Sequence, residues 1–263
     1  MLLLAFIGLF AGFLSGVLGI GGGIITLSAI YFLAPIAGLP SYTLASCTGF
    51  AAAQSLASCT SSSWVHYHQK RLHIKTTLWM GIIAMGGSFL GGLSTQKIPE
   101  IAIQWTYCGT ILLLMTLYFL RKESSSTPDT PLPNLSIQWI KNNPLKALLT
   151  STLTLSCGAI AGLLGIGGSI FLIPIMAVFL GLPTIIAIGC GAGTALLISL
   201  ASLISKASTG GLLWEQALII ALTAFIGGRL GAQCTRYIPP HLLRIFLLSI
   251  MAIALTRMLA DLL

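Results

Sequence analysis

Charged residues are missing from long stretches of this chain. No Asp, Glu, Lys or Arg occurs before Lys70, and residues 147–205 are also free of these four residue types. Each stretch is long enough for several bilayer-crossing helices, because one such helix needs about 20 mainly apolar residues. Only 7% of all residues are charged, against about 25% in soluble domains. This pattern predicts an all-α, polytopic membrane protein with no room for a soluble catalytic domain.

The apolar residues gather in eight blocks. Between the fourth and fifth blocks, residues 121–146 are polar and contain four prolines, which is typical of a linker. We therefore predict a first transmembrane repeat over residues 1–120, a linker loop over residues 121–146 and a second transmembrane repeat over residues 147–263. The blocks cover residues 2–37, 42–65, 76–95, 101–120, 147–181, 184–205, 213–235 and 241–260.

The first and fifth blocks share a motif, which reads GFLSGVLGIGGGII at residues 12–25 and GAIAGLLGIGGSIF at residues 158–171. Five of its glycines coincide at an offset of 146 positions. Shared motifs in the same order indicate an internal duplication. The further matches are Gly38-Leu39-Pro40 with Gly181-Leu182-Pro183, Cys47 with Cys190, and Gly86-Gly87 with Gly227-Gly228.

Each of these two blocks is too long to span the membrane once as a continuous helix. A continuous helix of about 35 residues would extend ~53 Å, whereas the hydrocarbon core is about 30 Å thick. We predict that each block breaks in its middle, at GIGGG and at GIGGS. A broken block that crosses once gives parallel halves, and one that folds back gives inverted halves. Loop charge does not decide between these models, but paired broken segments favour inverted repeats. In the inverted model Lys206 is a loop cation on the outer side.

The two breaks are the first candidate for a binding site. Half-helices starting near Ile24 and Ile170 would each present free N–H groups and about half a positive charge, which suits an anion. The alternative is close helix packing through small residues four positions apart. We accept packing for Gly12, Gly16, Gly158 and Gly162 only, because three adjacent glycines face every side of a helix. The candidate substrate-binding residues are Gly21, Gly22, Gly23, Gly167, Gly168 and Ser169.

Hydroxyl and amide side chains inside the apolar blocks are the second group of candidates. Sixteen of the nineteen residues 45–63 are Ala, Ser, Cys, Thr or Gly, and residues 189–195 have a similar composition. Such helices either pack tightly or line a polar path. We select Thr48, Gln54 and Thr194, because their side chains can form hydrogen bonds with an anion and because a buried amide needs a partner.

A third group consists of two cysteines and one arginine. Cys47 and Cys190 could contact the sulfur of a substrate, or could be small apolar fillers. Arg229 lies deep in an apolar block, where a charge is a functional hypothesis, and its counterpart Ser88 is neutral. Arg229 could bind an anion, pair with Glu215, or extend to the membrane interface.

Several other classes of function do not fit. No lysine follows the glycines, as a nucleotide-binding loop would require, and the six cysteines lack metal-ligand spacing. The four histidines are assigned to loops, so an intramembrane serine such as Ser15 would lack a base. The net charge of +8 is attributed to positively charged loops rather than to nucleic-acid binding. We therefore expect no metal, no cofactor and no enzyme activity.

The two glycine motifs, in two homologous halves, resemble those of the sulfite exporter TauE/SafE family, also called toluene sulfonate uptake permeases. The resemblance covers the whole chain except the linker. The family pattern is roughly G-x-G-G-G with a proline five residues later. The first half has Ser28 at the proline position, and the second half keeps Pro174 but has Ser169 as the last residue of the glycine run.

This resemblance implies a multi-pass protein of the bacterial inner membrane that transports small sulfur-containing or carboxylate anions, such as sulfite, sulfonates or thiosulfate. We expect a secondary transporter working by alternating access. Its coupling would be to the proton gradient or the membrane potential, because the chain has no ATP site. The alternatives are a passive anion channel and a membrane scaffold subunit.

Overall fold

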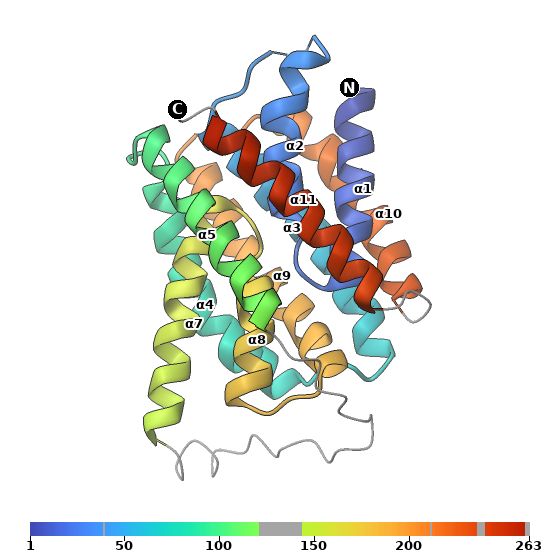
Figure 1. Cartoon of the computed structure of the whole chain (residues 1–263), viewed down its shortest axis with the longest axis vertical. Helices are drawn as coiled ribbons and strands as arrows, with labels where there is room; N and C mark the ends of the chain where they lie inside the picture. Colours follow the sequence, from blue (N-terminus) through green and yellow to red (C-terminus); the bar gives the residue numbers. More distant parts are fainter. Residues whose placement is uncertain (39, 121–143, 211, 236–239, 261–263) are drawn as a thin grey trace.

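The structure, a computed structural model, describes residues 1–38, 40–120, 144–210, 212–235 and 240–260 (Figure 1). Every regular element within these ranges is an α-helix, which confirms the all-α prediction. The first half contains α1 (Leu2–Leu18), α2 (Gly23–Ile36), α3 (Leu44–His68), α4 (Ile74–Ser94) and α5 (Glu100–Leu120). The second half contains α7 (Pro144–Leu164), α8 (Ser169–Phe179), α9 (Thr184–Ser208), α10 (Trp214–Cys234) and α11 (Pro240–Ala260).

Four of the described helices are long and apolar enough to cross a membrane, namely α4, α7, α10 and most of α9. Three shorter apolar helices accompany them, namely α1, α2 and the last part of α11. Helix α3 has 25 residues, which is long enough to span a membrane, but it carries many Ser and Thr side chains. The linker predicted over residues 121–146 falls mostly outside the described residues, and α7 already begins at Pro144.

Both predicted helix breaks are confirmed. Helix α1 ends at Leu18 and α2 begins at Gly23, while α7 ends at Leu164 and α8 begins at Ser169. In each break three glycines have a left-handed backbone, which costs other L-residues about 1–2 kcal/mol each. Their φ angles are 67°, 87° and 65° at Gly19, Gly21 and Gly22, and 71°, 76° and 69° at Gly165, Gly167 and Gly168.

The chain reverses direction at each break. In Figure 1, α1 runs down from the N-terminus and α2 returns toward the same end of the molecule. Helix α7 runs up from the opposite end, and α8 returns toward it. Each glycine motif therefore connects two antiparallel helices that meet in the interior of the molecule.

The two halves are interleaved. Helix α1 packs along α10 and α7 packs along α4, so each broken segment lies against a helix of the other half. A β-carbon added to Gly12 would lie 2.5 Å from Ala224 O, and one added to Gly158 would clash with Ala84 O. Gly16 and Gly162 lie equally close to their partner helices. The packing role predicted for these four glycines is confirmed.

The helices correct the sequence match between the halves. Helices α3 and α9, and likewise α4 and α10, begin and end 140 positions apart. This register pairs Phe50 with Cys190, so Cys47 and Cys190 are not equivalent. It also pairs Phe89, rather than Ser88, with Arg229. Neighbouring glycines such as Gly86-Gly87 allow an alignment that is shifted by one residue, which caused the error at Ser88. The Cys47–Cys190 match was three residues out of this register.

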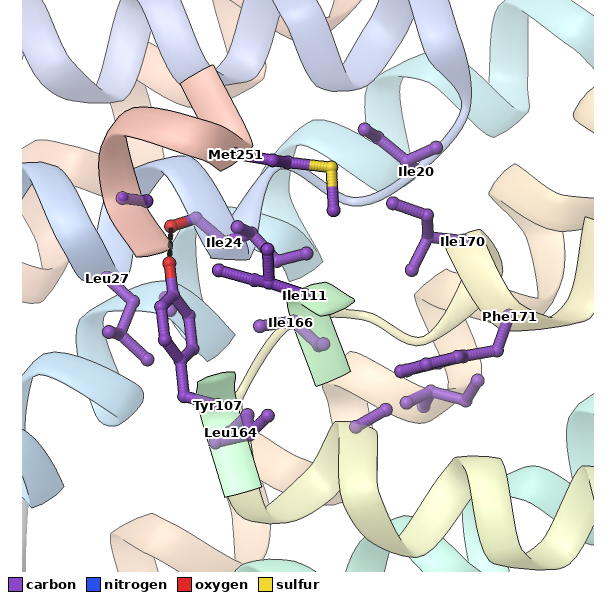
Figure 2. Close-up of a cluster of buried hydrophobic side chains, with 14 of the residues drawn as sticks. Ile20, Ile24, Leu27, Tyr107, Ile111, Leu164, Ile166, Ile170, Phe171 and Met251 are labelled. Atoms are coloured by element: carbon purple, nitrogen blue, oxygen red, sulfur yellow. Dashed lines mark hydrogen bonds between the residues drawn. The ribbon is translucent and has the colours of Figure 1, made fainter. Parts of the chain in front are cut away.

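An apolar cluster covers one side of the breaks (Figure 2). Ile20, Ile24 and Ile170 of the broken segments pack there with Met251 of α11 and other buried aliphatic side chains. Tyr107 of α5 donates a hydrogen bond of 3.1 Å to Ile24 O. Helices α5 and α11 therefore hold the start of α2 in place and exclude water from this side.

Candidate functional site

The two glycine breaks touch each other at the centre of the molecule. A β-carbon added to Gly21 would lie 2.9 Å from Ile166 O and 3.2 Å from Gly167 Cα. One added to Gly23 would lie 2.6 Å from Gly165 O. We call this contact region, made by residues 19–23 and 165–169, the crossing. It contains all six residues that the glycine motifs predicted.

Two side chains bind the backbone of the crossing. Ser169 Oγ donates a hydrogen bond of 2.7 Å to Gly19 O in the other break. Ser55 Oγ, on α3, lies 2.5 Å from Gly21 O and 3.4 Å from Gly165 O. These hydroxyls satisfy carbonyl groups that the interrupted helices leave without partners.

The crossing is tightly closed in this structure. A β-carbon on Gly22 would lie 2.6 Å from Ala11 O and 2.8 Å from Gln54 Nε2. A β-carbon on Gly168 would lie 2.8 Å from Ala161 Cβ. A cavity of about 270 Å³ lies between α3, α9 and α10, away from the crossing, and its lining is apolar. A ligand could enter the crossing only if the two breaks moved apart.

Gln54, a candidate from the sequence, lies beside Gly22 of the crossing. The side chain is fully buried, and its Nε2 donates a hydrogen bond of 3.4 Å to Ser58 Oγ one turn along α3. Ser58 Oγ lies 2.9 Å from Ser15 Oγ of α1. These three side chains form a buried polar row beside Gly22.

Ser199, on α9, was not among the candidate substrate-binding residues chosen from the sequence. Its side chain is fully buried, and its Oγ has no hydrogen-bond partner in the described part of the chain. This oxygen would lie 3.3 Å from a β-carbon on Gly167, so it faces the crossing. A buried hydroxyl without a partner costs about 1–3 kcal/mol, which makes this oxygen available to a ligand.

Thr48 leads to a second missed residue, Lys206. The Lys206 side chain is only 3% exposed, although the sequence placed it in a loop. Its Nζ donates hydrogen bonds to Thr48 Oγ1 at 2.8 Å, Thr95 Oγ1 at 3.0 Å and Leu163 O at 2.9 Å. Thr48 O also packs directly against Gly165 of the crossing. Thr48 therefore links a buried ammonium group to the second break.

Within the described residues, the remaining four candidates form no hydrogen bond with the crossing. Thr194 is buried, and its Oγ1 donates to Gly191 O within its own helix. Cys190 Sγ accepts a hydrogen bond from His73 N at the start of α4. Cys47 is buried near the start of α3. Arg229 is exposed on the outer face of α10, which agrees with the alternative that it extends to the membrane interface.

The assignment of the histidines to loops was wrong for three of the four, and His73 lies outside the helices, directly before α4. His66 and His68 belong to the last turn of α3, and His241 lies in the first turn of α11. The His66 ring is fully buried, and neither ring nitrogen has a hydrogen-bond partner in the described ranges. The described residues include no group of three His, Cys, Asp or Glu side chains that could hold a metal ion.

Comparison of the sequence with known proteins points to one protein family. The sequence model of the sulfite exporter TauE/SafE family matches residues 4–258. The chain is 28% identical to a protein of Methanocaldococcus jannaschii named a "probable membrane transporter protein", over 95% of this chain and 92% of that protein. Proteins similarly named from Bacillus subtilis (23% identical, 89% and 88% covered) and Haemophilus influenzae (24% identical, 93% and 92% covered) also match. No solved structure gives a significant match.

Proposed function

This chain belongs to the sulfite exporter TauE/SafE family of membrane transporters, and from that premise we propose that it carries a small sulfur-containing anion of the sulfite, sulfonate or thiosulfate class. The observation that carries this proposal is the crossing of the two glycine breaks. The half-helices α2 and α8 both begin there, at Gly23 and Ser169. Each N-terminus contributes about half a positive charge, so the two together complement one anionic charge.

The groups around the crossing suit an oxyanion. The Gln54 amide and the Ser199 hydroxyl can donate hydrogen bonds to sulfite oxygens, and the Ser55 hydroxyl can do so once it releases Gly21 O. The left-handed glycines let the backbone approach a ligand closely. The aliphatic cluster on the other side keeps the site dry, which strengthens every electrostatic interaction within it.

The mechanism that we propose is alternating access. Because the crossing is closed on all sides, an anion can pass only after the breaks separate. Inverted repeats are the architecture that we propose for this movement, and the opposite directions of α1 and α7 support them (Figure 1). On this basis residues 1–120 and 147–263 are the two repeats, in the inner membrane of a bacterium. Coupling to the proton gradient or the membrane potential would drive the cycle.

The geometry favours transport over nucleophilic catalysis. The Ser15 hydroxyl is bound to Ser58 at 2.9 Å. Neither nitrogen of the buried His66 ring has a partner in the described segments, so no Ser–His hydrogen bond activates a nucleophile there.

Uptake of radiolabelled sulfite into proteoliposomes tests the function. We expect saturable uptake that responds to an imposed pH gradient or membrane potential and that thiosulfate inhibits more strongly than acetate does. Liposomes without protein are the control. Uptake that is linear in sulfite and insensitive to both gradients would favour the passive channel. No uptake of any of these anions by folded protein would overturn the proposal and favour a scaffold role.

A further inference from the structure

Lys206 carries a positive charge for which the described residues supply no negative partner. The described ranges contain two carboxylates, Glu100 and Glu215, and both are exposed. Glu100 Oε1 accepts a hydrogen bond from Leu44 N at the start of α3. Lys206, in contrast, is bound only by neutral oxygens from three other helices.

A buried ammonium without a counter-ion is expensive. Desolvation of one such charge costs several kcal/mol even after the protein relaxes. The carbonyl end of a helix offsets part of this cost, and Leu163 O belongs to the last turn of α7. Charged side chains inside a membrane protein that lack a structural partner are by default functional.

Lys206 lies next to the crossing. Leu163 precedes the second break by two residues, and Thr48 O packs against Gly165 within that break. Two of the three oxygens that bind the ammonium group therefore belong to residues that must move if the breaks separate. The movement that opens the crossing would also release Lys206 from its present partners.

The equivalent position in the first half holds a different residue. The 140-residue register of α3 and α9 pairs Lys206 with His66. Both side chains are buried in the last turn of their helix. Only the second half therefore places an amine there, and His66 is a matched control position.

We propose that Lys206 is the counter-ion of the transported anion. In the closed structure Thr48, Thr95 and Leu163 hold its ammonium group. When the breaks separate, the ammonium exchanges Thr48 and Leu163 for the anion, so that the two opposite charges neutralise each other while the site is occupied. The inference rests on the proposed function, because it needs sulfite or a related anion as substrate.

The test measures the KM and kcat of sulfite uptake for three variants. Lys206→Met removes the charge but keeps the length of the side chain, and we expect a KM at least tenfold higher, which corresponds to about 1.4 kcal/mol. Lys206→Arg keeps the charge and should stay within about threefold of the wild type. His66→Leu, at the matched position, should also stay within about threefold. Gel filtration and the thermal midpoint in detergent show whether each variant folds.

Thr48→Val gives an independent result that does not depend on the folding of Lys206→Met. Removing this hydroxyl removes an oxygen that competes with the anion for the ammonium group. We expect the KM for sulfite to fall in Thr48→Val. An unchanged or higher KM would overturn the inference.

The two proposals fail in different ways. Wild-type protein without sulfite uptake would overturn the proposed function. Wild-type uptake combined with an unchanged KM in Lys206→Met would overturn only the role of Lys206. Equal increases of KM in Lys206→Met and His66→Leu would also overturn it, because loss of packing in either half would then explain both.

Discussion

The two glycine breaks share a backbone but differ in their surroundings. Gly22 and Gly168, at equivalent places, have φ angles of 65° and 69°. The atoms nearest to a β-carbon on Gly22 belong to Ala11 O and the Gln54 amide, whereas those nearest to one on Gly168 belong to the side chains of Ala161 and Ile198.

The two breaks therefore share the backbone that the fold requires, but differ in the side chains that could bind a ligand. Three glycines in each break have a left-handed backbone, because both breaks need that conformation. Ser15 in the first half corresponds to Ala161 in the second, 146 positions later, so the polar row beside Gly22 has no counterpart beside Gly168. The Gln54 amide therefore lies beside the first break, whereas the Ser199 hydroxyl and the charge of Lys206 lie next to the second.

The largest expected effect comes from alanine at the two equivalent glycines. A left-handed alanine costs about 1–2 kcal/mol in both Gly22→Ala and Gly168→Ala. In Gly22→Ala the new β-carbon meets a carbonyl oxygen at 2.6 Å, whereas in Gly168→Ala it meets Ala161 Cβ at 2.8 Å and the flexible end of Ile198 at 2.9 Å. We expect Gly22→Ala to lose about 1 kcal/mol more, the lower end of the cost of overpacking a core. Unfolding by titration with a denaturing detergent measures this, and equal losses would remove the contrast.

A smaller effect should separate the two serines that face the crossing. Ser55→Ala removes hydrogen bonds to backbone carbonyls of both breaks, and we expect a loss of about 1 kcal/mol in the free energy of unfolding. Ser199→Ala removes a hydroxyl that has no described partner, so stability should stay the same or rise. The same detergent titration compares them. A larger loss in Ser199→Ala would mean that this hydroxyl is bound in the folded protein.

Ser15→Ala tests the polar row beside Gly22. It removes one hydroxyl–hydroxyl bond, and such bonds average about 0.6 kcal/mol in membrane proteins. We expect sulfite uptake to stay within about threefold of the wild type, the factor that corresponds to this energy. Complete loss of activity with an unchanged thermal midpoint would instead point to a nucleophilic serine.

The smallest effect is expected at Arg229. Its side chain is exposed on α10, and substitutions at such positions usually change stability by less than about 0.5 kcal/mol. Arg229→Gln should therefore leave unchanged both the free energy of unfolding, measured by detergent titration, and the KM for sulfite. A raised KM would show that the arginine reaches the anion after all.

The sequence predicted the breaks because their cause is local. An apolar block that is too long for the bilayer and has glycines in its middle must bend there. Charge in the loops could not show whether each broken block spans the membrane once or folds back on itself, because both models distribute the loop cations equally. The reversal depends on contacts between distant helices, such as those of Gly21 with Gly167.

The polar groups were predicted less completely. Gln54 was found because an amide deep in an apolar block is conspicuous. Ser199 was missed because one serine in a helix rich in small residues does not reveal which face it lies on. Lys206 was missed because it follows the apolar block by one residue, where a cation normally faces water. Its burial comes from α3, α4 and α7, and no local pattern encodes their convergence.

Equilibrium binding of radiolabelled sulfite to purified Gln54→Leu and Thr194→Val tests the central claim most directly. Both variants remove a buried polar group, but Gln54 Nε2 lies beside Gly22, whereas the Thr194 hydroxyl donates to Gly191 O within its own helix. If the polar side of the first break binds the anion, Gln54→Leu should lose at least about tenfold in affinity, or 1.4 kcal/mol, while Thr194→Val binds like the wild type. Wild-type affinity in a folded Gln54→Leu variant would contradict the assignment of the binding site to the crossing.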